Sequence, residues 1–315
     1  MTKIYTLTLN SALDRILHVS EIKFHYTNRT DKVYVGDGGK GTHVSHALTR
    51  LKQNNTAIAV LGGFAGSRLE SILLDEGINL MKFSVKHETR VCTSIFDKDN
   101  RSIKVNELGE SMSSIDCQRL DSFLDNLFGE NQIWVISGSL PQGVPKDYYA
   151  QLITKIQSFD NSKVFLDTSG EALKLGLEAK PFFVKPNDEE MESLVGYPIN
   201  SVADGLIAIK EVYEKYKIPN IGLSLGELGL IMKSENKIVY TPIYKVKTVK
   251  TIGAGDGLLG GIVYGFVNDF DLEVIAATGV AIGCISTSYE QMTYPESAEV
   301  KDMVEKIIPL QKRLK

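Results

Sequence analysis

Runs of apolar and β-branched residues alternate along most of the chain with longer segments that predict helices. This alternation is typical of an α/β fold, in which a central, mostly parallel sheet is covered by helices on both faces. Strands are predicted at residues 4–9, 57–61, 80–85, 133–137, 163–167, 182–185 and 221–225. Helices are predicted at residues 42–51, 68–75, 117–127, 147–157, 202–216 and 258–267.

Two segments of the chain show a different pattern. Residues 16–35 and 89–107 contain short β-like runs separated by polar stretches. Such runs predict hairpins. We expect the two segments to form a small β lid over the functional site of one domain that spans residues 1–315.

The composition narrows the range of functions. With 43% hydrophobic and 23% charged residues, the 315-residue chain predicts a substantial core. The net charge is −4 and there is no basic block, so neither a nucleic acid nor an anionic membrane is an expected partner. The expected partner is a small molecule.

The cysteines and the N-terminal residues indicate a cellular compartment. The three cysteines are far apart and form no C-x-x-C pair, which is typical of a reducing environment. The sequence shows no signal peptide and no apolar run long enough to span a membrane. We therefore expect a cytoplasmic protein.

The most informative segment is residues 250–257, with the sequence Lys-Thr-Ile-Gly-Ala-Gly-Asp-Gly. It follows the β-branched run 245–249, so it predicts a strand, a glycine turn and a helix. The small residues at 253–255 let backbone N–H groups converge at the helix N-terminus, which is a ready site for an anion. Asp256 is then placed to take a proton from an attacking hydroxyl. The alternative is that Asp256 is only an N-cap.

A second glycine-rich turn resembles a dinucleotide-binding loop. Residues 36–41 match G-x-G-x-x-G before a predicted helix, but the next strand, 57–61, ends without an acidic residue for a ribose. The same spacing within residues 255–260 leads into a long helix instead of a second strand. Lys40 does not fit a P-loop either, because Gly41 follows it. Lys40 suits a phosphate or a sugar oxygen, and the alternative is a solvated lysine in a turn.

Polar residues follow several predicted strands, at the sheet edge where ligands collect in open α/β folds. Residues 10–14 predict a polar turn in which Asp14 hydrogen-bonds a polyol or forms only an Asx turn. A turn at 137–143 follows another strand. Asn187 and Glu190 have the spacing of a capping box, which explains both residues structurally and is favoured on local grounds over a magnesium or phosphate role.

Together these segments resemble the ribokinase-like carbohydrate kinases, also called the PfkB family, over essentially the whole chain. The two family signatures are residues 38–41, Gly-Gly-Lys-Gly, and residues 253–256, Gly-Ala-Gly-Asp, with an N-x-x-E element at 187–190 between them. Within the family the chain resembles the hexose-phosphate branch, which contains 1-phosphofructokinase and tagatose-6-phosphate kinase. Five segments carry this second resemblance: 10–14, 28–29, 89–90, 106–107 and 137–141.

The resemblance implies a ribokinase-like fold and ATP-dependent phosphorylation of a ketohexose phosphate to the bisphosphate, with magnesium as a cofactor. It implies that Asp256 is the general base and that Gly253, Ala254 and Gly255 form an anion hole with it. It implies substrate contacts from Asp14, Gly38, Gly39, Lys40, His43, Arg90, Arg29 and Ser139. It implies ATP contacts from Lys185, Asn187, Ser224, Gly226, Gly229 and Thr251. Asn187 and Glu190 are expected to position Mg²⁺ through water, and the lid is expected to form a homodimer contact.

Three of the substrate residues are cations, which suits a substrate that already carries a phosphate. Guanidinium groups bind phosphate in a fork and lysine binds it as a point charge, so we expect Lys40, Arg90 and Arg29 to hold that group. Both fructose 1-phosphate and tagatose 6-phosphate stay open as substrates. The alternatives are a kinase of an unphosphorylated sugar or nucleoside, and a non-catalytic sensor of sugars or nucleotides.

Four positions depart from the family pattern. His43 replaces the usual Asn after the first signature, which affects how the sugar is oriented. Ser11 replaces a common Pro, and Gly257 replaces the usual Ser after the catalytic Asp. Lys250 stands where many relatives carry Asp, which argues against the monovalent-cation site described for some of them. None of these changes removes the proposed base or anion hole.

Overall fold

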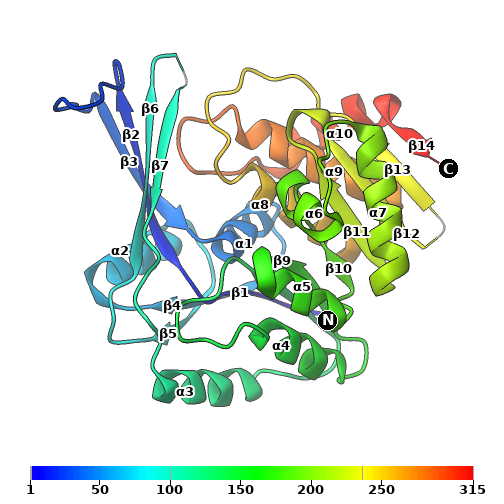
Figure 1. The fold of residues 1–315 in the computed structure, drawn as a ribbon, viewed down its shortest axis with the longest axis horizontal. Coiled ribbons are helices and arrows are strands. Elements are labelled where there is room, and N and C mark those ends of the chain that lie inside the picture. The colour runs from blue at the N-terminus through cyan, green and yellow to red at the C-terminus, as the bar shows by residue number, and fades with distance from the viewer. Residues whose placement is uncertain (1, 100, 236, 315) are drawn as a thin grey trace.

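The computed structural model describes residues 2–99, 101–235 and 237–314. A ten-stranded sheet runs through the molecule in the order β14-β13-β12-β11-β10-β9-β8-β1-β4-β5 (Figure 1). Its strands are β1 (Lys3–Thr8), β4 (Thr56–Leu61), β5 (Leu80–Ser84), β8 (Gln132–Ser137), β9 (Lys163–Asp167), β10 (Phe183–Val184), β11 (Asn220–Ser224), β12 (Leu230–Ser234), β13 (Lys237–Thr241) and β14 (Lys312–Leu314). Neighbours from β5 to β11 are parallel, and β12 to β14 extend the sheet antiparallel.

Helices cover both faces of this sheet, so the predicted fold class is confirmed. Alternate residues of β8 face opposite sides: Trp134 and Ile136 belong to one apolar core, Ile133 and Val135 to the other. The first core is closed by α3 (Ser114–Asp125), α4 (Tyr148–Gln157), α5 (Gly170–Glu178), α6 (Asp188–Val195) and α7 (Val202–Tyr216). The second is closed by α1 (Lys40–Arg50), α8 (Ala254–Val267), α9 (Leu272–Ser286) and α10 (Ser297–Ile307). No helix of the described ranges is long and apolar enough to span a membrane.

A separate four-stranded sheet projects from the N-terminal half of the body (Figure 1). Its order is β3 (Lys32–Gly38), β2 (Ala12–Val19), β6 (Arg90–Asp97) and β7 (Ser102–Asn106). We call this sheet the lid. Helix α2 (Gly63–Asp75) packs against both β2 and β4, and its Leu69 shares an apolar cluster with Leu13 of the lid and Leu61 of the main sheet. The lid is therefore anchored to the body at its base.

Two local predictions were wrong. Residues 10–14 were expected to be a turn, but β2 begins at Ala12, and Asp14 pairs in the ladder with Gly36 on one side and Cys92 on the other. Residues 245–249 were expected to be a strand, but they lie outside the strands of the described chain. The chain leaves the sheet after β13, and the Val249 N–H donates to the Thr287 carbonyl, 2.7 Å away, instead of joining a ladder.

Candidate active site

The N-terminus of α8 is open to a ligand. Its N-cap, Gly253, has φ +77°, and no side chain caps the helix. A Cβ at this position would lie 2.8 Å from Tyr294 Oη and 2.9 Å from Met292 Sδ, so the turn requires glycine on two grounds. Because the first helical N–H groups have no side-chain acceptor, they suit an anion. Asp256 lies in the first turn and is not the N-cap, so the capping alternative does not account for it.

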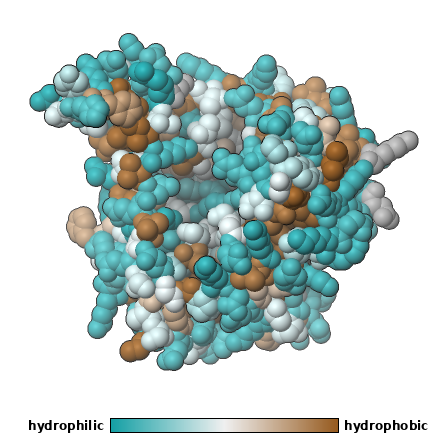
Figure 2. Space-filling view, viewed as in Figure 1, coloured by the Kyte–Doolittle hydropathy of each residue, from teal (hydrophilic) through white to brown (hydrophobic). Residues whose placement is uncertain are grey.

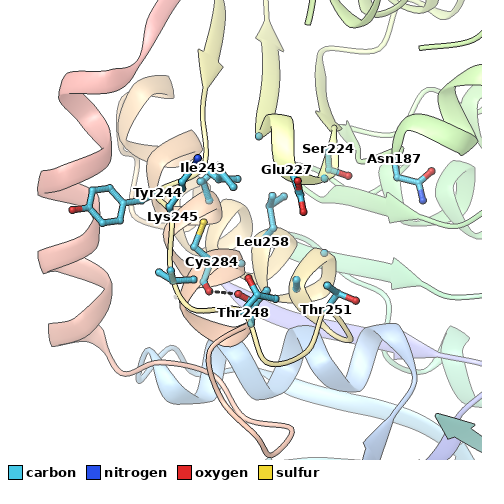
Figure 3. Close-up of a pocket in the computed structure, with 18 of the residues that line it drawn as sticks. Asn187, Ser224, Glu227, Ile243, Tyr244, Lys245, Thr248, Thr251, Leu258 and Cys284 are labelled. Carbon is cyan, nitrogen blue, oxygen red and sulfur yellow. Dashed lines mark hydrogen bonds between the residues drawn. The ribbon is translucent and has the colours of Figure 1, made fainter. Parts of the chain in front are cut away.

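A cavity of about 550 Å³ lies beside this helix N-terminus (Figure 3). Predicted nucleotide residues from distant parts of the chain line it: Asn187, Ser224, Gly226, Gly229 and Thr251. Ala254 and Gly255 of the expected anion hole line it as well. Much of the wall comes from the loop after β13, including Ile243, Tyr244 and Lys245, which Figure 3 places opposite Asn187. The later part of this loop, residues 245–249, had been predicted as a strand. The size and the largely apolar walls suit a nucleotide base and ribose.

Lys185 does not line this cavity but lies next to it. Its Nζ is 3.9 Å from the position that a Cβ on Gly255 would take, so the ammonium faces the N-terminal turn of α8. The same Nζ is 3.3 Å from Asp167 Oδ2, and both side chains are almost fully buried. An anion bound at the helix N-terminus would therefore meet a fixed cation on its other side.

Asp167 is shared by two lysines. Its Oδ1 lies 2.9 Å from Lys40 Nζ, and Lys40 is also 3.6 Å from Glu190 Oε1. Burial opposes the charged form of Asp167, but the ammonium groups of Lys185 and Lys40 lower the pKa of this carboxyl. Burial also disfavours the charged form of Lys40. The carboxylates of Asp167 and Glu190 nevertheless raise the pKa of Lys40. Lys40 was expected at the sugar phosphate, whereas here its charge is already engaged on the nucleotide side of the site.

Asp167 was not among the site residues predicted from the sequence. It is the last residue of β9, a strand that was predicted correctly, so it lies at the carboxyl edge where ligands collect. Its position at the end of a predicted strand could have indicated a site residue, but nothing in the local pattern identified its lysine partners.

Asn187 and Glu190 form the predicted capping box at the start of α6. Asn187 Oδ1 accepts from the Glu190 N–H at 2.7 Å, and Glu190 Oε2 accepts from the Asn187 N–H at 2.9 Å. Glu190 Oε1 is left for Lys40. Among the described residues, no group of three or more His, Cys, Asp or Glu side chains is arranged to hold a metal ion. The oxygen donors of Asp167, Asn187 and Glu190 nonetheless fit Mg²⁺, which keeps several of its waters.

The sugar side of the site is at the junction of the lid and α1. A Cβ on Gly38 would lie 2.5 Å from Asp14 Oδ1, and Gly39, with φ +104°, leads into α1. The absence of a side chain on Gly38 lets the backbone approach the Asp14 carboxylate closely. Figure 2 shows a hollow on this face of the molecule, beside the projecting lid, with hydrophilic residues at its floor. The fold thus places Asp14 next to Gly38, and Gly39 follows at the start of α1.

Arg90 and Ser139 both form hydrogen bonds with Asn10. The Arg90 guanidinium donates from Nε and Nη2 to the Asn10 carbonyl at 3.2 and 3.1 Å, and from Nη1 to the Glu107 carbonyl at 3.1 Å. The Asn10 amide donates to Ser139 Oγ at 3.0 Å. Two of the predicted phosphate and sugar residues therefore share one corner of the site. Arg29 is not part of this corner; it is exposed in the connection between β2 and β3.

His43 contacts the predicted base. Its Nδ1 lies 2.7 Å from Asp256 Oδ2, and its Nε2 lies 2.8 Å from the Asp37 carbonyl. The other departures from the family pattern are also explained in part. A Cβ on Gly257 would lie 2.7 Å from the Tyr294 ring, so a serine would need that ring to move. Lys250 is buried, and its Nζ donates to the Ser286 carbonyl at 3.1 Å.

Asp14→Asn is expected to stabilise the free protein at pH 7. Burial raises the pKa of Asp14 to about 6, although the charge of His43 opposes this rise. Ionisation of Asp14 in the native state therefore lowers the free energy of unfolding. The cost is full above pH 6 and shrinks as the pH falls below 6, because the native carboxyl is then neutral. It vanishes below pH 3.8, where the carboxyl of the unfolded chain is neutral as well. Urea unfolding should show a gain of up to about 3 kcal/mol at pH 7 that shrinks at pH 4. An equal effect at both pH values would contradict this assignment.

The match to known proteins extends over most of the chain. Residues 5–299 match the family described as pfkB family carbohydrate kinase. The chain belongs to this family. A 1-phosphofructokinase of Borreliella burgdorferi is 32% identical to this pfkB kinase over 281 residues, which cover 89% of the chain and 90% of the relative. A 1-phosphofructokinase of Bacillus subtilis is 29% identical over 308 residues, which cover 97% of each chain.

Solved structures agree with the family assignment. This pfkB kinase superposes on phosphofructokinase-2 from Escherichia coli, solved in complex with substrates and products, with a TM-score of 0.90 and 27% identity. The match covers 97% of this chain and 99% of that one. A ribokinase from Arabidopsis thaliana, at 17% identity and a TM-score of 0.76, supports the fold alone. The predicted family and ribokinase-like fold are therefore confirmed, and the protein is a carbohydrate kinase.

Proposed function

We propose that this kinase transfers the γ-phosphoryl group of ATP to a ketohexose phosphate, with fructose 1-phosphate as the preferred acceptor. The observation that carries the proposal is the position of Asp256, in the first turn of the open helix α8, between the nucleotide-sized cavity and the lid that bears Asp14. The names of the two relatives, both 1-phosphofructokinases, favour fructose 1-phosphate. Tagatose 6-phosphate is the second candidate.

In the proposed reaction Asp256 accepts the proton of the sugar hydroxyl. The hydroxyl oxygen then forms a bond to the γ-phosphorus as the bond from that phosphorus to the β,γ-bridging oxygen breaks, which leaves ADP and a sugar bisphosphate. The N–H groups at the start of α8 face the transferring phosphoryl group, and Lys185 adds a positive charge beside them. These groups are held rigidly by the glycine turn and by Asp167, so little reorganisation accompanies the transfer.

Asn187 and Glu190 are the residues we propose to hold Mg²⁺ through water, with Asp167 nearby. When bound, the ion supplies charge neutralisation at the β- and γ-phosphate oxygens. Lys40 links these carboxylates, because its Nζ contacts both Asp167 and Glu190. We propose that Lys40 keeps this acidic cluster in place next to the phosphates. This role replaces the contact with the sugar phosphate that the sequence suggested.

Arg90→Ala is expected to raise the KM for the sugar phosphate with little change in kcat. The guanidinium fork lies at the corner shared by Asn10 and Ser139, and hydrogen bonds to a charged group contribute about 1.5–3 kcal/mol, so the rise should be about 10- to 100-fold. Steady-state kinetics with varied fructose 1-phosphate at saturating ATP measures the effect. Arg68→Ala, an exposed arginine on α2, is the control. An unchanged KM for Arg90→Ala would favour an unphosphorylated acceptor.

We also propose that the lid forms a homodimer. Val33, Val35 and Val105 are exposed on its strands, with 47%, 39% and 57% of each residue accessible. Burying them against a second lid would remove apolar surface from water. The double variant Val33→Lys, Val35→Lys should shift the protein from a dimer to a 34.8 kDa monomer in sedimentation velocity, whereas Leu74→Lys on α2 should not. A wild-type monomer at micromolar concentration would refute the proposal.

A further inference from the structure

Both ring nitrogens of His43 face hydrogen-bond acceptors. Nε2 is 2.8 Å from the carbonyl oxygen of Asp37, and Nδ1 is 2.7 Å from Asp256 Oδ2. A backbone carbonyl only accepts hydrogen bonds, so Nε2 must carry a proton. A neutral ring with its proton on Nε2 would direct the lone pair of Nδ1 at the Asp256 carboxylate. A ring with protons on both nitrogens satisfies both contacts.

The surroundings favour the charged ring. Burial opposes it, but the hydrogen bond to Asp256 and the charges of Asp37, Asp256 and Asp14 raise the pKa of His43 to about 10. Three carboxylates thus converge on a site where only 4% of the His43 side chain is exposed. The other neighbour is the Tyr294 ring, whose centroid is 6.4 Å away. An imidazolium at this point offsets part of the negative charge.

The fold fixes the orientation of His43. The residue lies in the first turn of α1, which packs against α8, and Asp256 lies in the first turn of α8. One turn further along α1, His46 Nδ1 contacts Asp37 Oδ2 at 3.2 Å. The Asp37 side chain, which is 1% exposed, is thereby held at the end of β3, and its carbonyl holds His43 Nε2. The orientation of the His43 ring is therefore fixed by Asp256 at Nδ1 and by the Asp37 carbonyl at Nε2.

We propose that His43 is a positioning residue, a permanently protonated imidazolium that holds Asp256 Oδ2 and leaves Oδ1 to accept the proton of the sugar hydroxyl. This inference rests on the proposed role of Asp256. Because both nitrogens are engaged within the protein, His43 acts on the base and does not read the hydroxyl groups of the sugar. The departure from the usual Asn therefore changes how the base is held, and the substrate preference has to come from other residues.

Nuclear magnetic resonance of ¹⁵N-histidine-labelled protein tests the protonation state without any assay of activity. The chain has five histidines, and the His43 signals are those lost in His43→Asn. We expect both ring nitrogens of His43 to be protonated at pH 8, where an ordinary histidine is neutral. Asp256→Asn should lower the pKa of His43, because the negative partner is lost. A ring that is neutral at pH 8 would overturn the inference.

Kinetics test the positioning role. His43→Ala should lower kcat about 10- to 100-fold with an unchanged KM for ATP, because the charge-assisted hydrogen bond to Asp256 is lost. His43→Asn should recover part of that loss, since an amide N–H can still donate to Oδ2. His25→Asn, at an exposed residue with φ +66° that Asn tolerates, is the control. Wild-type kcat in His43→Ala would refute the positioning role.

The failure of the proposed function and the failure of the inference about His43 give different results. If Asp256→Asn keeps wild-type turnover while His43 is doubly protonated in the wild type, Asp256 is not the base, and the positioning role is overturned with it. If Asp256→Asn is inactive but His43 is neutral at pH 8, the proposed reaction stands and the inference about His43 is wrong.

Discussion

Replacing Asp256 with asparagine is expected to lower kcat by about 10²- to 10⁴-fold, the usual contribution of a general base. The carboxylate lies in the first turn of α8, and only 13% of its side chain is exposed. Asparagine has nearly the same shape and can still contact His43, so the fold and the nucleotide cavity should persist. The loss should therefore appear in kcat, with the KM for ATP nearly unchanged.

Steady-state kinetics on purified wild-type and variant protein measure this effect, with thermal unfolding as a check on the fold. Asp302→Asn is the matched control, because Asp302 is exposed on α10 and pairs only with Lys306 among the ion pairs of the described chain. Near-wild-type kcat in Asp256→Asn would remove Asp256 from the reaction. An equal fold-loss of kcat in Asp256→Asn and Asp302→Asn would indicate a general effect of losing a negative charge.

Asp167→Asn is expected to destabilise the protein by about 3–5 kcal/mol, the typical result of removing one partner from a buried ion pair. Asp167 and Lys185 are 1% and 4% exposed, so Lys185 would be left as a buried ammonium without its carboxylate. Lys40 contributes less, because 37% of its side chain is exposed and it retains Glu190. The variant should also bind ATP less well, because Lys185 would no longer be fixed next to Gly255.

Urea unfolding at pH 7 measures the change, and a double-mutant cycle identifies its cause. Adding Lys185→Met to Asp167→Asn should recover part of the lost stability, since the unpaired ammonium is removed. Additive losses in the double variant would show that the two side chains do not depend on each other. Such additivity would contradict the ion cluster as the element that holds Lys185.

The local pattern of the sequence was sufficient for most of the parallel sheet and for the two glycine signatures. A strand buried on both faces, such as β8 or β9, is a short apolar run, and its length of 6 or 5 residues favours a strand over a buried helix. Gly39 and Gly253 stand out because each has a positive φ that other residues rarely adopt. These features are encoded within a few neighbouring residues.

Other elements depend on contacts that are distant in sequence. Helix α9 was not predicted, because it is buried almost all round and lacks the polar face that marks an amphipathic helix. The β-branched run at 245–249 has strand propensity but no neighbouring strand to pair with, and it forms a wall of the cavity instead. Asp14 was placed in a turn because its two ladder partners lie 22 and 78 residues further along the chain, at Gly36 and Cys92.

The side-chain partners in the site could not be inferred from the sequence. Lys40 was predicted to bind a phosphate, and nothing in the sequence indicated its contact with Asp167, 127 residues away. His43 was predicted to contact the sugar, and nothing in the sequence indicated its contact with Asp256, 213 residues away. Spacing within one segment shows which groups are near a helix N-terminus. The charges that these groups meet are decided by the packing of α1 against α8 and by the contact of Lys40 with Asp167 at the end of β9.

Phosphorylation of a ketohexose phosphate by this kinase can be measured as ATP consumption in the presence of magnesium. The acceptors to compare are fructose 1-phosphate, tagatose 6-phosphate, fructose 6-phosphate, fructose and ribose, each with purified protein. We predict turnover confined to the phosphorylated ketohexoses and highest with fructose 1-phosphate. Turnover highest with fructose or ribose, or absent with every sugar, would contradict the account.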